Sequence, residues 1–189
     1  MPKFVAFVFK VLISVLLIGI IVSAATMIIM SFITINRIQN IAQIVQMDIA
    51  EHNCMLYPVY DSYASQVLSI CDRSTLRGLN LIDVEDRADP SSFISVYKKG
   101  HKGENSYIQD TEGSEGTIEG GTGEFTVANY GDILCFETKV FVRPQLFYAP
   151  AGPNSPTTQD FEVIVMTGPD GNGYPVTLTY EVPALTYLK

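Results

Sequence analysis

The feature that most constrains this chain is a run of 25 residues without a charge, VLISVLLIGIIVSAATMIIMSFITI at residues 11–35. Lys10 precedes the run, and Arg37 is the first charged residue after it. As an α-helix the run would be about 37 Å long, against a bilayer hydrocarbon core of about 30 Å. A buried helix of a soluble protein rarely continues so far without a polar face. We therefore predict a membrane-spanning helix.

A cleaved secretory signal is the alternative for the same segment. Lys3 and Lys10 would form its basic region, and a small-residue cleavage site would lie near Ala24. The apolar run continues past that point to Ile35, however, whereas the apolar part of a signal is about 7–15 residues long. We expect the segment to be retained as an anchor.

Charge predicts how the chain is oriented in the membrane. Residues 1–10 carry Lys3 and Lys10 and no acid, so the positive-inside rule places this tail in the cytoplasm and everything after Ile35 outside. Apart from these two lysines, the chain has ten basic residues against twenty acidic ones, a net charge of about −10. Such a charge argues against binding to nucleic acid or to anionic lipid.

The helical pattern continues beyond the apolar run, through residues 36–53. Polar residues such as Asn40 and Gln43 occupy one face of this segment. Apolar residues at three- and four-residue spacing form the other face; they are Ile38, Ile41, Ala42, Val45 and Ile49. From residue 4 to 53 there is no proline, and Gly19 is the only glycine. We predict one helix over residues 4–53, about 75 Å long, whose second half packs on another part of the protein.

Residues 54–189 are predicted to form a β-rich head. Pro58 marks the first break, and a second helix is expected over residues 60–69, starting near Asp61 or Ser62. The predicted fold class is therefore α+β, with a long N-terminal helix that carries an antiparallel sheet.

Period-two alternation of apolar residues predicts the strands of this sheet. They are expected at residues 93–97, 124–130, 133–142, 161–167 and 176–182, with shorter candidates at 79–84, 105–109 and 184–189. Turns at 130–132 and 169–173 are expected to close two hairpins. The glycine-rich residues 110–123 and the proline-rich residues 143–156 are expected to be loops.

The chain has three cysteines, an odd number that allows at most one intrachain disulfide. A disulfide persists in the oxidising compartment predicted for the head. We expect Cys54 to pair with Cys71, because this bond would staple the end of the first helix to the second. Cys135 lies in an apolar strand and is expected to be a small buried residue.

The sequence contains no recognisable catalytic motif. His52 is interpreted as a helix-end or surface residue, and His101 as part of a basic turn. Glu51 and His52 are adjacent on a helix and point about 100° apart, which does not suit a shared metal ion. The glycine-rich residues 116–123 lack the lysine and the following helix of a phosphate-binding loop. We expect the protein not to be an enzyme, and to bind no metal, cofactor or small-molecule substrate.

The order of these elements resembles the pilin-like proteins, in particular the TadE-like minor pilins (pseudopilins) of Tad-type pili and related conjugation-associated subunits. The likeness is carried by the helix over residues 4–53, by Asn129-Tyr130-Gly131-Asp132-Ile133 and by the ending Leu185-Thr186-Tyr187-Leu188-Lys189. Unlike type IV pilins, the chain has no glycine directly before the apolar run and no acid within it. The resemblance does not extend to cleavage by a prepilin peptidase.

The resemblance implies a membrane-anchored structural subunit that polymerises, with itself or with other pilin-like subunits, through its N-terminal helix. The expected packing residues are Ile18, Gly19, Ile21, Ser23, Met30, Ile38, Ile41, Ala42, Val45 and Ile49. Gly19 and Ser23 form a small-xxx-small pair, which is either a contact face or ordinary tolerance of small residues in a span. The alternative function is a single-pass anchored adhesive or ligand-binding ectodomain, with residues 38–49 packed on its own head.

Overall fold

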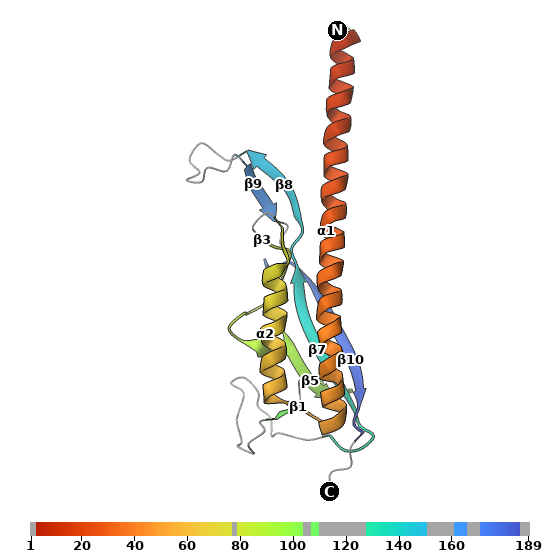
Figure 1. Cartoon of the computed structure of the whole chain (residues 1–189), viewed down its shortest axis with the longest axis vertical. Helices are drawn as coiled ribbons and strands as arrows, with labels where there is room; N and C mark the ends of the chain where they lie inside the picture. Colours follow the sequence, from red (N-terminus) through yellow and green to blue (C-terminus); the bar gives the residue numbers. More distant parts are fainter. Residues whose placement is uncertain are drawn as a thin grey trace.

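The computed structural model describes residues 3–76, 79–103, 107–109, 128–150, 161–165 and 171–185. Its dominant element is α1, Lys3–His52, one uninterrupted helix of 50 residues. The N-terminal half of α1 projects from the molecule, and the C-terminal half lies along the head (Figure 1). The predicted single helix and the α+β fold class are confirmed.

Local chemistry explains why α1 neither breaks in its apolar half nor continues past His52. Ser14, Thr26 and Thr34 each donate a hydroxyl hydrogen bond to the carbonyl oxygen four residues earlier, at 2.9 Å. Asn53 then has a φ angle of 56°, the left-handed conformation that commonly terminates helices. These three hydroxyl groups of the charge-free run are thus paired within the helix itself.

The second helix, α2, spans Tyr57–Arg73 and runs antiparallel to the C-terminal half of α1 (Figure 1). It is longer at both ends than the predicted helix over 60–69, and it does not start at Asp61 or Ser62. Pro58 lies inside its first turn, where the missing N–H needs no partner, so this proline begins the helix rather than breaking the chain. One face of α2 is buried, at Tyr60, Tyr63, Ala64, Val67 and Cys71.

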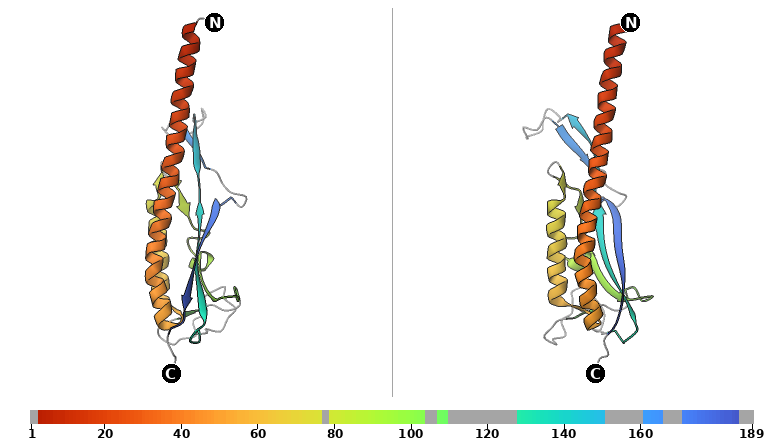
Figure 2. Two further views of the ribbon diagram at one scale, coloured as in Figure 1. Left: turned by 90° about the vertical axis from the view of Figure 1, so that its right-hand side faces the viewer. Right: turned by 45° about the vertical axis from the view of Figure 1, so that its right-hand side comes forward.

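The main sheet is organised around β7, Ile133–Val142. Along one edge β7 pairs antiparallel with β10, Tyr174–Pro183, over its full length. Its other edge is shared by β5, Ile94–Lys98, and β4, Ile82–Asp83. Both helices lie on one face of this sheet, so the head has two layers with the core between them (Figure 2).

Short elements complete the described chain. They are β1 (Met55–Leu56) paired with β6 (Ile108–Gln109), β2 (Thr75–Leu76) paired with β3 (Leu79–Asn80), and the 3-10 turn η1 (Pro90–Ser92). The strand predicted at 79–84 is thus divided between β3 and β4. The strand predicted at 105–109 is shortened to β6.

The two predicted hairpins are wrong. Residues 143–156 were expected to be a loop, but they contain β8, Gln145–Pro150, which pairs with β9, Phe161–Val165. Consequently β9 does not pair with β10 across the turn at 169–173. Gly173 helps to direct β10 onto β7 instead, since a Cβ atom there would lie 2.7 Å from the carbonyl oxygen of Val142. Prolines at the ends of β8 do not interrupt pairing with a single neighbour.

The other hairpin was expected between 124–130 and 133–142. Residues 124–127 lie outside the described residues, and 128–130 form no strand. Both edges of β7 are already occupied by β10, β4 and β5. The turn at 130–132 is confirmed: Gly131 has a φ angle of 88°, and Asp132 N–H donates to the carbonyl of Asn129 at 3.0 Å. Residues 184–185 form no strand, and 110–123 and 186–189 lie outside the described residues.

Candidate functional site

The N-terminal half of α1 presents apolar side chains on all sides. Phe4, Phe7, Leu12, Ile18 and Ile21 are each more than half exposed. By length and composition, α1 is long enough and apolar enough to cross a membrane. This surface is the most unusual one on the molecule, because large contiguous apolar surfaces on soluble proteins are rare.

The head meets α1 from Ala24 onwards. Ala24 and Met30 are partly buried against the core, and Met27 is buried in it. The hydroxyl-bearing Thr34 is also buried. The head therefore begins to cover one side of α1 before the charge-free run has ended.

Further along α1, one stripe forms part of the core of the head. Ile38, Ala42, Val45 and Ile49 are at most 3% exposed, and Ile41 is partly buried beside them. The prediction that this half of the helix packs on another part of the protein is confirmed. The stripe faces α2 and the sheet of its own chain, so the expectation that Ile38 and Val45 contact neighbouring subunits is wrong.

The remaining predicted packing residues lie on or near the bare part of α1. Ile18 and Ile21 are exposed, Ser23 is half-buried, and Met30 contacts the chain's own core. A Cβ atom at Gly19 would meet nothing within 4 Å, so no close contact in the single chain requires a glycine there. A role for Ile18, Gly19, Ile21 and Ser23 between subunits stays a prediction.

A second apolar stripe of α1 was missed by the sequence interpretation. Ile29, Ile33, Ile44 and Met47 are exposed by 57%, 42%, 68% and 75%. At 3.6 residues per turn they lie within about 60° of one another around the helix, and the exposed Asn40 lies on the same face between Ile33 and Ile44. We call these four residues the outer stripe. Its signal in the sequence was the presence of Ile44 and Met47 among the polar residues opposite the packed face.

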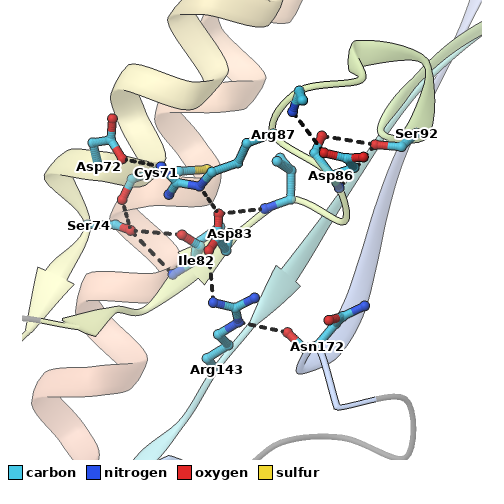
Figure 3. Close-up of polar contacts among 12 residues, drawn as sticks. Cys71, Asp72, Ser74, Ile82, Asp83, Asp86, Arg87, Ser92, Arg143 and Asn172 are labelled. Carbon is cyan, nitrogen blue, oxygen red and sulfur yellow. Dashed lines mark hydrogen bonds and ion pairs between the residues drawn. The ribbon is translucent and has the colours of Figure 1, made fainter.

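The most connected polar group is centred on Asp83, whose side chain is 10% exposed (Figure 3). One carboxylate oxygen accepts from Arg87 Nε and the other from Arg143 Nη1, both at 2.8 Å. Arg87 also donates to Asp72 at 2.7 Å, which raises the pKa of Arg87, and Arg143 donates to the carbonyl of Asn172 at 2.9 Å. These contacts join the end of α2, β4, the end of β7 and the approach to β10. We interpret the group as structural, since both carboxylate oxygens of Asp83 already accept hydrogen bonds from arginine side chains.

The predicted disulfide is not formed. Cys54, Cys71 and Cys135 form no disulfide, and all three are buried. Cys54 precedes α2 and Cys71 lies near its end, so about 20 Å of helix separates them, whereas the Cα atoms of a disulfide are about 5.5–6 Å apart. Burial, and then the charge of Asp48, raises the pKa of Cys54 to about 11. Burial raises the pKa of Cys71 to about 12, so neither thiol is ionised at neutral pH.

The face of the sheet away from the helices carries paired charges around Glu137. This carboxylate accepts from Tyr97 Oη at 2.6 Å, from Lys102 Nζ, and from Thr179 Oγ1 at 3.2 Å. Partial burial favours a higher pKa for Glu137, but the hydrogen bonds from Lys102 and Tyr97 outweigh it and lower the pKa. Beside Glu137 is a cleft of about 370 Å³, lined mainly by hydroxyl and charged side chains: Ser91, Ser92, Ser95, Lys102, Lys139 and Thr177.

Histidine, cysteine and carboxylate side chains do not gather into a metal site in the described part of the chain. No group of three or more His, Cys, Asp or Glu residues among them could hold a metal ion. His52 Nδ1 lies 3.1 Å from the carbonyl oxygen and 3.2 Å from the carboxylate of Asp48, one turn earlier. This contact agrees with the interpretation of His52 as a helix-end residue.

No protein-family model, curated protein sequence or solved structure matches this chain. The proposals that follow therefore depend on the residues and the geometry described above. The surfaces of α1 are the strongest of these observations.

Proposed function

We propose that the protein is a membrane-anchored structural subunit of a pilus-like filament, or of a related secretion or conjugation assembly, similar to the TadE-like minor pilins. Residues 11–35 span the membrane, the N-terminus is cytoplasmic, and the head lies outside the cell. Its partners are further copies of itself or other pilin-like subunits.

The observation that carries this proposal is the continuity of α1. A simple anchor needs only a span, and a flexible linker between span and head would serve it equally well. Here the same helix that carries the apolar segment also contributes Ile38, Ala42, Val45 and Ile49 to the core of the head. The apolar segment and part of the core of the head thus belong to one uninterrupted helix, which suits a subunit that is drawn from the membrane into an ordered helical array.

The outer stripe supplies a surface on which such an array could form. Exchanging lipid for a neighbouring helix gains little hydrophobic free energy for residues already in the bilayer, so close packing has to select the contact there. Ile44 and Met47 lie beside the head, where the surroundings are aqueous. Full burial of each side chain against a neighbour would contribute about 1.5–3 kcal/mol.

Mutation of the outer stripe tests the proposal. We expect the wild-type chain in the sheared surface fraction of its host, as a polymer that sediments. Ile44→Asp with Met47→Asp should leave the chain folded, because both side chains are exposed, and should strongly reduce the sheared fraction. Ser65→Asp with Gln66→Asp is the matched control, since these two neighbouring exposed positions lie on α2, off the stripe.

Two results would contradict the proposal. One is recovery of the wild-type protein only as a monomer in the membrane fraction. The other is an unchanged polymer from the Ile44→Asp, Met47→Asp variant, with a circular dichroism melt showing that it is folded.

The cleft beside Glu137 favours a second candidate, an anchored ligand-binding ectodomain. The cleft offers serine and threonine hydroxyl groups, and its two lysines, Lys102 and Lys139, already pair with Glu137 and Glu85. These groups suit a polar ligand without strong net charge, such as a carbohydrate. Ser95→Tyr should fill part of the cleft. The test is binding of the full chain in detergent to a panel of glycans. The candidate function requires saturable binding to at least one glycan and loss of that binding in Ser95→Tyr.

A further inference from the structure

The main sheet of the head has one long strand with a bare edge, β10. Among the described residues, β10 pairs with β7 alone, along one of its two edges. It lies at the margin of the head and runs towards the C-terminal end of α1 (Figures 1 and 2). The strand is ten residues long, and Glu181 is its only charged residue. A long exposed edge of this kind is a template for pairing with another strand.

The hydrogen bonds of β7 show which backbone groups of β10 face this edge. Lys139 N–H donates to the carbonyl of Phe93 at 2.8 Å. The carbonyl of Ile133 accepts from Lys99 N–H at 2.9 Å. Because backbone groups alternate in direction along a strand, the odd-numbered residues of β7 bond towards β5 and the even-numbered ones towards β10. Even-numbered residues of β7 lie opposite even-numbered residues of β10, so the odd-numbered residues of β10 direct their N–H and C=O groups outwards.

Two prolines define the usable length of the edge. The outward-directed positions are Pro175, Thr177, Thr179, Glu181 and Pro183. Proline has no N–H, and in sheets it occupies positions of this outward kind. Three N–H groups therefore remain as donors. The two prolines lie four residues before and four residues after Thr179, so the edge is symmetric about this residue.

This symmetry makes the edge complementary to a second copy of itself. In an antiparallel pair centred on Thr179, Thr177 of each copy lies opposite Glu181 of the other, and proline lies opposite proline. Every outward N–H then has a carbonyl to bind, and no charge faces a like charge. A pair centred on Glu181 would place two carboxylates opposite each other. A pair centred on Thr177 would leave the N–H of Glu181 beyond the end of the partner strand.

The even-numbered side chains, on the helix side of β10, favour the same contact. Val176, Leu178 and Tyr180 pack on the core of the head but remain partly exposed. In the pair centred on Thr179, Leu178 of one copy lies opposite Tyr180 of the other, and Val176 lies opposite Val182. Each copy would thus cover apolar surface that the single chain leaves open to water.

We propose that two copies of the chain join edge to edge through β10 and form one continuous sheet across both heads. The two-fold axis of this pair is perpendicular to the sheet, so the two α1 helices lie on the same face and run in opposite directions. Their apolar N-terminal halves leave the dimer at opposite ends. Chains anchored in one membrane cannot adopt this arrangement, so the pair joins chains anchored in two facing membranes.

The contact goes beyond the proposed filament, because it does not use the outer stripe. Its assignment to facing membranes rests on the membrane insertion of α1, which is part of the proposed function. The pairing of two heads does not depend on that insertion. It can therefore be measured with the full chain in detergent.

Cysteine crosslinking tests the register of the pair. The two Thr179 Cα atoms would be about 5.5 Å apart, within disulfide range, whereas the two Thr177 Cα atoms would be about 13 Å apart. With a mild oxidant, Thr179→Cys should form a covalent dimer and Thr177→Cys should not, since the native cysteines are buried. A mixture of Thr177→Cys and Glu181→Cys should crosslink. A folded Thr179→Cys variant that stays monomeric would overturn the proposal, as would equal crosslinking of Thr177→Cys alone.

A proline variant tests whether the backbone edge makes the contact. Thr179→Pro removes an outward N–H and leaves the hydrogen bonds to β7 in place. Each copy loses one hydrogen bond, so the dimer should be at least about tenfold weaker by sedimentation in detergent. Thr179→Val is the control: it keeps the N–H, and like the proline variant it lacks the hydroxyl contact with Glu137. Equal dimerisation of the two variants, with both folded by circular dichroism, would overturn the proposal.

Reconstituted vesicles test the facing membranes and separate this inference from the proposed function. Thr179→Cys chains with two different affinity tags are placed in separate phosphatidylcholine vesicles, which are mixed and oxidised. We expect dimers that contain both tags. Dimers that contain both tags only when the two chains share one vesicle would overturn the facing-membrane arrangement. Adding Ile44→Asp and Met47→Asp, which should abolish the filament, should leave the crosslink unchanged; its loss would show that the dimer depends on the outer stripe and would overturn the edge contact.

Discussion

The phenol oxygen of Tyr63, on α2, lies 2.8 Å from the hydroxyl oxygen of Thr138 on β7. Both side chains are buried, and the ring of Tyr63 also meets Phe136 edge-on, with centroids 5.2 Å apart. Burial raises the pKa of Tyr63 despite the hydrogen bond to Thr138, so the phenol stays neutral. Because both hydroxyl groups are shielded from water, each needs the other as its hydrogen-bond partner. The pair therefore helps to fix the position of α2 on the sheet.

Removing this phenol should destabilise the head. Tyr63→Phe leaves the hydroxyl of Thr138 without its partner, and we expect the free energy of unfolding to fall by about 1–3 kcal/mol. Chemical denaturation of the full chain in detergent, followed by near-ultraviolet circular dichroism, measures the change. The control is Tyr57→Phe, at a position 45% exposed, which should change stability by less than about 0.5 kcal/mol. Equal effects of the two substitutions would show that the pair does not hold α2.

Two isoleucines on α1 test which side of the helix the head covers. Ile49 is fully buried and Ile44 is 68% exposed. Ile49→Ala should therefore cost about 2–5 kcal/mol of unfolding free energy, through lost transfer energy and the cavity left behind. Ile44→Ala should cost less than about 0.5 kcal/mol in the monomer. A larger loss of thermal stability for Ile44→Ala than for Ile49→Ala would contradict the orientation of α1.

Much of α1 followed from its sequence, because the relevant rules are local. The charge-free run and the lack of helix breakers predict one helix. The spacing of its apolar residues predicts that the second half is packed, at Ile38, Ala42, Val45 and Ile49. Which surface covers that half is a tertiary property. These residues belong to the core of the head. A fragment of residues 54–189 would therefore lack part of that core.

The strand pairings could not be predicted because they are long-range. Each strand of the predicted hairpins satisfied the period-two pattern, yet β7 pairs with β10, β5 and β4, and β8 pairs with β9. Alternation identifies a strand but not its neighbour. The Cys54–Cys71 disulfide was wrong for a related reason: the cysteines are close in sequence, but α2 is longer than predicted and places them near its opposite ends.

Glu137 should make the stability of the head depend on acidic pH. Its folded-state pKa lies below the ordinary value of 4.5, so it contributes stability above about pH 4.5 that is lost as the pH falls through the lower folded pKa. Between about pH 5 and pH 3, wild type should lose more stability than Glu137→Gln, in which this titration is absent. Denaturation at a series of pH values checks this expectation, and parallel curves for the two proteins would contradict it. Asp132, whose pKa is lowered by Lys98, titrates in both proteins.

The three cysteines should be reduced and unreactive in the folded chain. Burial of Cys54 and Cys71 raises their pKa values to about 11 and 12, and the thiolate is the reactive form. We expect an alkylating reagent to label almost no thiol in the native protein at pH 7.5, and three per chain after unfolding without a reductant. Mass spectrometry counts the labels. One label per unfolded chain would instead reveal an intrachain disulfide.

The central claim is that α1 is one rigid helix from the bilayer into the core of the head. Spin labels on Ile18→Cys and Ile44→Cys report on it directly, since both positions are exposed and the native thiols are buried. The two labels are placed on the same chain, and double electron–electron resonance measures the distance between them after reconstitution. For a continuous helix, the distance distribution should be narrow and centred near 39 Å, the rise over 26 residues. A broad distribution at shorter distances would mean that the helix breaks between the span and the head, and would contradict the account.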